Sequence, residues 1–390
     1  MAAPRYSASE MLTRLVGFDT TSQDSNLALI AFVEDYLAAY GIASMRILNE
    51  SGDKANLLAT VGPERPGGII LSGHSDVVPV EDQPWSSNPF TLTDRDDKYF
   101  GRGTCDMKAF LAIALALLPE MLARPLRVPL HLAISYDEEI GCMGVIPMVE
   151  RIAAQLPRAR ACIVGEPTEM GLVVSHKSTT RYDVHILGRE AHSSMPQLGA
   201  NAIHAASLLA AKLVEMVHER EANPIPDSRF VPPWTTIHIG TIRGGTAQNI
   251  VPLDCCFSWE YRLHPGDDGD AIVERFTRYA REDVEPWLKR HAPEASIEIA
   301  LTSSVPPLLP DRDNAAESLV RQLSGINTAS VVSFATEAGH FQGAGIPTVV
   351  CGPGSIDQAH KPDEFISKAQ LAAGEDFQRR LIRWAQEEAS

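Results

Sequence analysis

Apolar and polar positions follow two different periods along the first half of the chain. Apolar residues at helical spacing predict helices at 9–16, 26–39 and 143–155. A continuous apolar run at 109–118, which stops at Pro119, predicts a helix that is buried on every side. Short apolar runs between these segments predict strands, at 44–49, 55–61, 69–72, 130–136 and 161–164. Strands that alternate with helices favour an α/β sheet.

The pattern changes after Lys177. Strands and helical stretches now follow one another in the order β-α-β-β-α-β, which is typical of a compact ferredoxin-like α+β unit. The strands are predicted at 180–187, 235–242, 256–263 and 296–301, and the helices at 201–218 and 270–291. The chain then returns to the α/β pattern, with a helix at 314–323, a strand at 348–351 and a terminal helix from Ser367.

These patterns predict two domains, since a chain of 390 residues is too long for one small core. The first is an α/β domain with a mixed sheet, formed by residues 1–177 and 303–390. The second is the inserted ferredoxin-like α+β unit, formed by residues 178–302. The predicted architecture is therefore a mixed-sheet α/β domain interrupted by a smaller unit.

Composition narrows the class of protein without identifying its chemistry. The chain is 44% hydrophobic and 22% charged, as expected for a soluble globular protein. Its net charge of −16 disfavours nucleic acid and anionic membranes as partners, and its longest apolar run, ten residues, is too short to span a bilayer. The six cysteines contain no C-x-x-C pair, which favours reduced thiols. The N-terminus also lacks a signal-peptide pattern, so we expect a cytoplasmic protein.

Candidate chemical groups stand where the predicted strands end. His74 and Asp76 follow the strand at 69–72, and in a His-x-Asp pair the carboxylate can hold the second ring nitrogen of a metal-bound imidazole. Acidic residues also follow two later strands, and open α/β sheets build their sites at these carboxyl ends. The resulting set comprises His74, Asp106, Glu138, Glu139, Glu166 and His360.

Together these side chains point to a metal centre. An isolated His or Glu lies more often at the surface or in a hydrogen-bonded core position. Imidazoles and carboxylates at successive strand ends, however, form a ligand set for Zn²⁺, and also for Co²⁺ or Mn²⁺. Asp106 stands where one carboxylate would bridge two ions. The adjacent Glu138 and Glu139 point in different directions, so one can bind metal while the other serves as a general base.

Six segments carry a resemblance to a known family: SGHSDVVP, GRGTCDMK, DEEIGCMG, GEPT, GREAHSS and GPGSIDQAHKPDEF. They resemble the co-catalytic zinc amidohydrolases and metallopeptidases, along nearly the whole chain. That family includes acetylornithine deacetylase, succinyl-diaminopimelate desuccinylase, aminoacylases and glutamate carboxypeptidase. The last segment and the triplet Thr336-Glu337-Ala338 most resemble the deacetylase, because the desuccinylases usually carry Ser-Asp in place of Thr-Glu.

The resemblance implies a role for each candidate residue. The implied metal ligands are His74 with Glu166 on one ion, Glu139 with His360 on the other, and Asp106 between them. It further implies that Asp76 orients His74 and that Glu138 is the base. A cis peptide bond between Asp106 and Met107 is also implied. For the unit at 178–302, the resemblance implies a lid and dimerisation domain.

The implied reaction is removal of the acetyl group from N2-acetyl-L-ornithine, giving acetate and L-ornithine for arginine biosynthesis. Two ions share a water, Glu138 takes its proton, and the resulting hydroxide attacks the amide carbonyl. A succinyl-diaminopimelate desuccinylase or another N-acyl-amino-acid amidohydrolase would use the same metal chemistry. A non-catalytic, metal-stabilised binding protein is disfavoured, because a binder has no need for the base Glu138.

Four residues are candidates for binding the N-acyl amino acid substrate, each with a plainer alternative. Arg262 and Lys177 would pair with its carboxylate, or be surface charges. Glu337 would pair with its side-chain ammonium, or make a structural hydrogen bond. Asn249 would donate to the developing oxyanion, or cap its loop.

His192 lies in the inserted unit, away from the metal candidates, where an exposed His on a loop is usually inert. In relatives, the corresponding His reaches the active site of the partner subunit and donates to the tetrahedral intermediate. The resemblance therefore implies a homodimer whose sites are completed in trans.

Overall fold

The structure, a computed structural model, describes residues 3–387, which form two compact units. The first unit runs up to Ser175, takes in Leu308–Val331, and resumes at Thr336. The second unit comprises His176–Pro307 and the short segment Val332–Ala335. The chain thus passes between units at 175/176 and 307/308, beside the sequence-predicted boundaries of 177/178 and 302/303.

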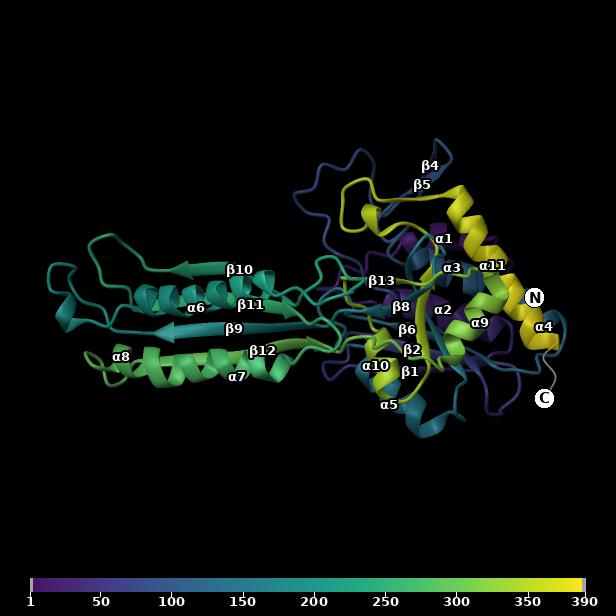
Figure 1. The fold of residues 1–390 in the computed structure, drawn as a ribbon. Coiled ribbons are helices and arrows are strands. Elements are labelled where there is room, and N and C mark those ends of the chain that lie inside the picture. Colours follow the sequence, from purple (N-terminus) through teal and green to yellow (C-terminus); the bar gives the residue numbers. More distant parts are fainter. Residues whose placement is uncertain (1–2, 388–390) are drawn as a thin grey trace. The chain divides into compact units, whose positions relative to one another are not determined.

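An eight-stranded mixed sheet forms the centre of the first unit (Figure 1). Its strands, in spatial order, are β1 (Ser44–Leu48), β2 (Ala55–Val61), β6 (Leu130–Ser135), β3 (Ile69–His74), β7 (Ala161–Pro167), β14 (Thr348–Gly352), β8 (Val173–His176) and β13 (Ser330–Val332). The central strands β6, β3, β7 and β14 are parallel, and Ile69 pairs with both Leu130 and Ala161. Every residue of these four strands is buried, which explains their nearly continuous apolar sequences.

Helices surround this sheet and complete its core. They are α1 (Ala8–Val16), α2 (Leu27–Ala39), α3 (Lys108–Ala116), α4 (Leu118–Ala123), α5 (Ile146–Gln155), α9 (Ala315–Ser324), α10 (Ala338–Gly343) and α11 (Lys368–Glu387). Helix α3 is buried from Lys108 to Leu115, as its apolar run predicted, and it packs against α1 and α11 (Figure 1). Full burial of each Leu or Ile side chain in this core contributes about 1.5–3 kcal/mol.

Local sequence sets the ends of several helices. Ser7 and Glu10 form a capping box at the start of α1. Asn314 caps α9, where its buried Oδ1 accepts from the backbone N–H groups of Ala316 and Glu317. Such a cap stabilises the protein by about 1 kcal/mol. Helix α9 ends at Gly325, whose φ of 74° lies in the left-handed region that glycine adopts without strain.

Two predicted helices differ in the structure. The helix predicted at 109–118 ends at Ala116, two residues early, and a second helix, α4, begins at Leu118. Pro119 does not end a helix but lies in the first turn of α4, where a missing N–H costs nothing. The predicted helix at 270–291 is divided into α7 (Gly269–Tyr279), a π-helical turn (Ala280–Val284) and α8 (Glu285–Lys289). Pro286 again lies in the first turn of the new helix.

A small three-stranded sheet in the first unit was not predicted. It consists of β4 (Thr93–Arg95), β5 (Lys98–Phe100) and β15 (Phe365–Ser367). Each strand is only three residues long, too short to show a period in the sequence. The sheet nevertheless places Phe365 opposite Phe100, so segments separated by more than 260 residues in sequence lie side by side.

The second unit has the predicted βαββαβ order. Its elements are β9 (Thr179–Leu187), α6 (Ala202–Ala222), β10 (Thr236–Gly244), β11 (Asp254–Arg262), α7 with α8, and β12 (Ser296–Val305). The four strands form an antiparallel sheet in the order β10-β11-β9-β12, which is the ferredoxin-like arrangement (Figure 1). Trp259 and Phe276 lie at the centre of its separate core. Among residues 3–387, no helix has the length and apolar character that crossing a membrane requires.

Candidate metal centre

Neighbouring strands of the large sheet bring the predicted metal ligands together. His74 is the last residue of β3, Glu166 lies near the end of β7, and Glu139 follows β6 after a short turn. His360 follows β14 through a loop. Because β6, β3, β7 and β14 are parallel neighbours, their carboxyl ends meet at one edge of the sheet. The strands β3 and β7 run further than predicted, so His74 and Glu166 lie within them rather than after them.

Asp106 lies between the two histidines. Its Oδ1 is 3.0 Å from His74 Nε2, and its Oδ2 is 3.4 Å from His360 Nε2. Each histidine also faces one glutamate: His360 Nε2 is 2.8 Å from Glu139 Oε2, and His74 Nε2 is 3.8 Å from Glu166 Oε1. Each oxygen of one carboxylate therefore faces a different His–Glu pair, which is the arrangement a bridging ligand needs. The peptide bond between Asp106 and Met107 is cis, as the resemblance implied.

Carboxylates crowd this edge of the sheet, and their pKa values respond. Burial is the main cause that raises the pKa of Glu138 to about 8 and that of Glu139 to about 7, and the charge of Asp106 contributes to both. Burial also raises the pKa of Glu166 well above its usual value. Hydrogen bonds with Asp106 and Glu139 raise the pKa of His360 to about 10. Burial and neighbouring carboxylates disfavour the negative charge of these acids. A bound cation would stabilise that charge.

The donor set fits divalent metal ions. Within the described part of the chain, the buried Glu166 Oε1 has no hydrogen-bond partner, although buried carboxylate oxygens normally have one. Two groups bring their ligand atoms within 4.8 Å of one another: His74 with Asp106 and Glu139, and His74 with Glu138 and Glu166. Both groups use His74, whereas the sequence-based assignment gives each ion its own histidine. The short distances from His360 to Glu139 and Asp106 favour the latter arrangement.

Asp76 holds two parts of this edge together. His74 Nδ1 donates to the backbone carbonyl of Asp76 at 2.9 Å, which leaves Nε2 as the ring nitrogen free to bind metal. The Asp76 carboxylate lies 3.5 Å from the same Nδ1 and accepts hydrogen bonds from the backbone N–H groups of Glu138 and Glu139. Asp76 thus contacts both His74 and the turn that carries the two glutamates.

The three consecutive acids of that turn have different partners. Asp137 forms an ion pair with Lys54, with 2.6 Å between Oδ1 and Nζ. Glu138 Oε1 accepts a hydrogen bond from the thiol of Cys142 at 3.2 Å. Glu139 faces His360, as described above. Adjacent Glu138 and Glu139 therefore point in different directions, as the sequence indicated. Among the described residues, Glu138 forms no hydrogen bond or ion pair with either histidine, although its carboxylate lies within 4.8 Å of His74 Nε2 or Nδ1.

Two substrate-binding candidates lie in the second unit and already have partners. Lys177 is buried, and its Nζ donates to the backbone carbonyls of Pro232 and Trp234 at 2.8 and 2.6 Å. Burial lowers the pKa of Lys177 to about 8, and the charge of Arg262 contributes. Arg262 Nε donates to Glu260 at 3.1 Å. Lys177 is therefore not a surface charge, whereas Arg262 is partly exposed. Contact of either residue with a substrate carboxylate stays a prediction.

Glu337 is also engaged. It is fully buried, and its two carboxylate oxygens accept hydrogen bonds from Ser72 Oγ at 2.6 Å and Ser135 Oγ at 2.7 Å. These serines lie on β3 and β6, so Glu337 links α10 to the middle of the sheet. Of its two sequence-based alternatives, this geometry favours the structural hydrogen bond over contact with a substrate ammonium group.

His192 and Asn249 lie next to each other in the second unit. His192 forms a β-bridge with Ile250, and Ser193 N–H donates to the backbone carbonyl of Asn249 at 3.0 Å. The His192 ring is exposed, and its Nδ1 accepts from the backbone N–H of Ser194 at 3.2 Å. In a neutral ring the proton then resides on Nε2, which makes this nitrogen a hydrogen-bond donor.

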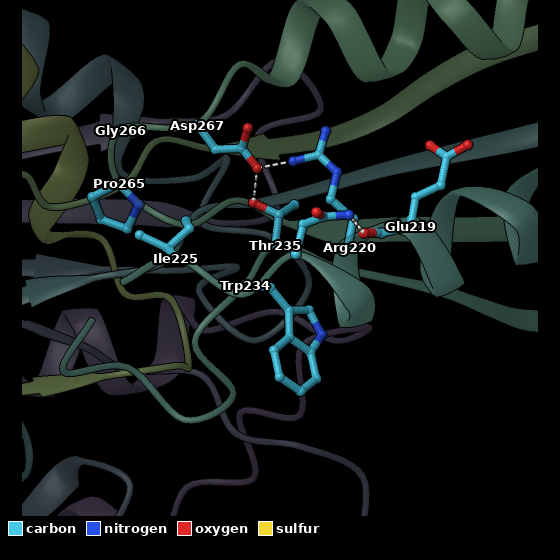
Figure 2. Close-up of a pocket in the computed structure, with 9 residues that line it drawn as sticks. Glu219, Arg220, Ile225, Trp234, Thr235, Pro265, Gly266 and Asp267 are labelled. Atoms are coloured by element: carbon cyan, nitrogen blue, oxygen red, sulfur yellow. Dashed lines mark hydrogen bonds and ion pairs between the residues drawn. The ribbon is translucent and has the colours of Figure 1, made fainter. Parts of the chain in front are cut away.

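A separate pocket in the second unit has a volume of about 500 Å³ (Figure 2). In Figure 2, Asp267 accepts from Thr235 Oγ1 at 2.5 Å and pairs with Arg220. Arg220 and Asp267 therefore neutralise each other, and Glu219, the remaining charged lining residue, pairs with Arg275 outside the lining. The nine lining residues include none of the predicted site residues, so this pocket is not an alternative to the metal centre.

The sequence-based reasoning missed Arg102 and Glu364. Both lie in segments that it had singled out, GRGTCDMK and HKPDEF, but neither occupies a strand end. In the structure they form a buried ion pair directly beside Asp106. The available signal was their opposite charge: Arg102 shares a segment with the predicted ligand Asp106, and Glu364 shares a segment with the predicted ligand His360.

Known proteins resemble this chain over most of its length. The profile described as peptidase family M20/M25/M40 matches residues 70–384. The chain is 34% identical over 376 residues to acetylornithine deacetylase from Myxococcus xanthus, covering 95% of each chain. It is 35% identical over 372 residues to acetylornithine deacetylase from Yersinia pestis, covering 93% of this chain and 92% of the relative.

Solved structures share the fold at lower sequence identity. An M20 family metallo-carboxypeptidase from Sulfolobus solfataricus aligns with a TM-score of 0.75 at 16% identity, covering 98% of this chain and 99% of its own. A dinuclear metal-binding peptidase of the M20 family from Bacillus subtilis aligns with a TM-score of 0.62 at 16% identity, with the same coverage. Both likenesses extend over the whole fold.

Proposed function

Because the chain belongs to peptidase family M20/M25/M40, and is thus a metal-dependent hydrolase acting on amides, we propose that it deacetylates N2-acetyl-L-ornithine. The products are acetate and L-ornithine. The observation that carries the metal chemistry is Asp106, whose two oxygens face His74 and His360 separately. The identity of 34–35% with acetylornithine deacetylases over more than nine-tenths of the chain supports the choice of substrate.

Two divalent ions would be held by the five predicted ligands, His74, Asp106, Glu139, Glu166 and His360. Zn²⁺ suits this set best, with Co²⁺ as the alternative. When bound, the ions polarise the amide carbonyl and activate a water molecule. Glu138, which lies beside the ligands but has its own partner in Cys142, takes a proton from that water and returns it to the leaving amine nitrogen.

A panel of N-acyl amino acids tests the substrate assignment. Metal-reconstituted protein should hydrolyse N2-acetyl-L-ornithine with a kcat/KM at least about tenfold above that for N-succinyl-diaminopimelate, other N-acetyl amino acids and dipeptides. A clear preference for the succinyl compound would instead assign a desuccinylase. Preference for another N-acetyl amino acid would assign a different amidohydrolase of the same family.

The proposed setting is the cytoplasm, in the arginine biosynthetic pathway. All six cysteines are free thiols in the structure, which suits a reducing compartment. We further propose that the second unit serves as a lid and dimerisation domain, and that the protein is a homodimer. Measurement of its mass in solution by light scattering tests the dimer.

His192→Ala should lower kcat by about two to three orders of magnitude, which is the scale for losing one oxyanion donor. The reason is the exposed Nε2–H, which His192 can offer to a developing oxyanion because Ser194 occupies Nδ1. Steady-state kinetics and metal analysis check this, since the substitution should leave metal content unchanged. A kcat within about tenfold of wild type would remove His192 from the reaction.

Mixing His192→Ala with Glu138→Gln tests completion in trans. After subunit exchange, heterodimers should recover activity, because one of their two sites draws an intact His192 and an intact Glu138 from different chains. Verified heterodimers that remain inactive would show that His192 acts within its own chain or not at all.

A further inference from the structure

Arg102 and Glu364 form an ion pair inside the first unit. Arg102 Nη1 donates to Glu364 Oε2 at 2.9 Å, and each side chain is only 1% exposed. Removing two charges from water is costly, so a buried ion pair is weak evidence for a stabilising role. The other contacts of these two side chains indicate what the pair does.

The Glu364 carboxylate holds the backbone that leads into Asp106. Its Oε1 accepts hydrogen bonds from the N–H groups of Cys105 at 2.8 Å and Asp106 at 3.0 Å. Its Oε2 accepts from the N–H of Gly103 at 3.0 Å, in addition to Arg102. One buried carboxylate therefore accepts from three backbone N–H groups of the loop 103–106, and the last belongs to the predicted bridging ligand itself.

The Arg102 guanidinium holds the segment that carries His360. Its Nη1 also donates to the carbonyl of Lys361 at 3.2 Å, and its Nη2 donates to Gln83 Oε1 at 2.5 Å. Gln83 Nε2 in turn donates to the carbonyl of His360 at 3.2 Å. His360 has a φ of 61°, a left-handed conformation that a non-glycine residue keeps only when its surroundings enforce it.

The two sets of contacts meet in one ion pair. Asp106 and His360 lie 254 positions apart in sequence, yet the backbone at both is fastened to Arg102–Glu364. The fork of the guanidinium matters here, because it reaches Glu364, Lys361 and Gln83 at once, whereas an ammonium group is a single compact charge. The pair thus sets the separation between a predicted bridging ligand and a predicted terminal ligand.

We propose that Arg102 and Glu364 are positioning residues that preset the Asp106–His360 geometry for metal binding. The inference rests on the proposed metal centre and extends it to two residues that touch neither ion nor substrate. Residues that orient metal ligands in this indirect way typically change metal affinity by 10–100-fold when replaced. Glu364→Gln should act on this scale, because its amide NH₂ would face a backbone N–H that now donates to a carboxylate oxygen.

The test measures Zn²⁺ affinity by competition with a chelator, together with the melting temperature of the metal-free protein. Glu364→Gln and Arg102→Lys should each weaken the affinity for at least one of the two ions by about 10–100-fold. Asn314→Ala is the matched control, since Asn314 is another buried side chain that accepts from two backbone N–H groups, but at α9. It should lower the melting temperature and leave Zn²⁺ affinity unchanged.

Each outcome decides between the proposals. Affinities within about threefold of wild type in both charge-pair variants would overturn the positioning role and leave the proposed function intact. A wild-type protein that binds no Zn²⁺ would overturn the proposed function and the inference with it. If Glu364→Gln yields no folded protein, Arg102→Lys alone decides the question. That substitution keeps the buried positive charge and removes only the branched guanidinium that reaches several partners at once.

Discussion

Glu138→Gln is expected to lower kcat by about two to four orders of magnitude, the range for a well-placed general acid–base group. The amide keeps the shape of the side chain but cannot take up a proton from water or return it to the leaving amine. Because Glu138 bonds to Cys142 rather than to either histidine, its replacement should leave the metal ligands in place. Steady-state kinetics, with metal content measured on the same samples, check this result.

Asp137→Asn provides a matched control for that variant. Asp137 is the neighbouring acid on the same turn, but its carboxylate pairs with Lys54 instead of facing the ligands. Its φ of 56° is one that Asn tolerates well. We expect this substitution to cost stability and to keep kcat within about tenfold of wild type. A Glu138→Gln variant that also stays within tenfold would exclude Glu138 as the base.

Asp106→Ala is expected to abolish the tight binding of both ions, and turnover with it. Its two oxygens face the two histidines at 3.0 and 3.4 Å, so one substitution removes a ligand from each proposed ion. Four acids, Asp76, Glu138, Glu139 and Glu166, would remain at this edge without the bound ions that would otherwise neutralise them. Metal analysis after extensive dialysis is the direct measurement.

Asp106→Asn serves as the companion variant, because it keeps the volume and one oxygen. It should retain more metal than Asp106→Ala and less than wild type, since a neutral amide is a poorer ligand for a divalent ion. Two tightly bound ions per chain in the Ala variant would rule out Asp106 as a bridge. The melting temperature of each metal-free variant separates loss of ligation from loss of the fold.

Much of the fold follows from local patterns in the sequence. The apolar runs around Ile70 and Ile163 lie in buried parallel strands, and these residues show no polar alternation that would indicate an exposed face. The same reasoning placed the ends of β3 and β7 too early. His74 and Glu166 are polar and were therefore expected to lie beyond the strands. In the structure both are buried and belong to the strands β3 and β7.

Most of the candidate site was predicted from residues at strand ends, and Asp106, which lies just before α3, was the exception. His74, Glu139 and Glu166 stand at or just after strands, and parallel neighbours necessarily bring such ends together. Contacts made through long-range packing left no such signal. Nothing local indicates that Glu337 lies between Ser72 and Ser135, or that Lys177 donates to two carbonyls of a proline-rich loop. The same reason explains why the Arg102–Glu364 pair was not foreseen.

The central claim, that this chain hydrolyses an acyl-amino acid through ions held around Asp106, is tested most directly by titrating metal-free protein with Zn²⁺ or Co²⁺. Acetate release from N2-acetyl-L-ornithine is followed at each addition. The account predicts no turnover in the metal-free protein and a rate that rises until about two ions are bound per chain. Equal turnover before and after complete removal of metal would contradict it.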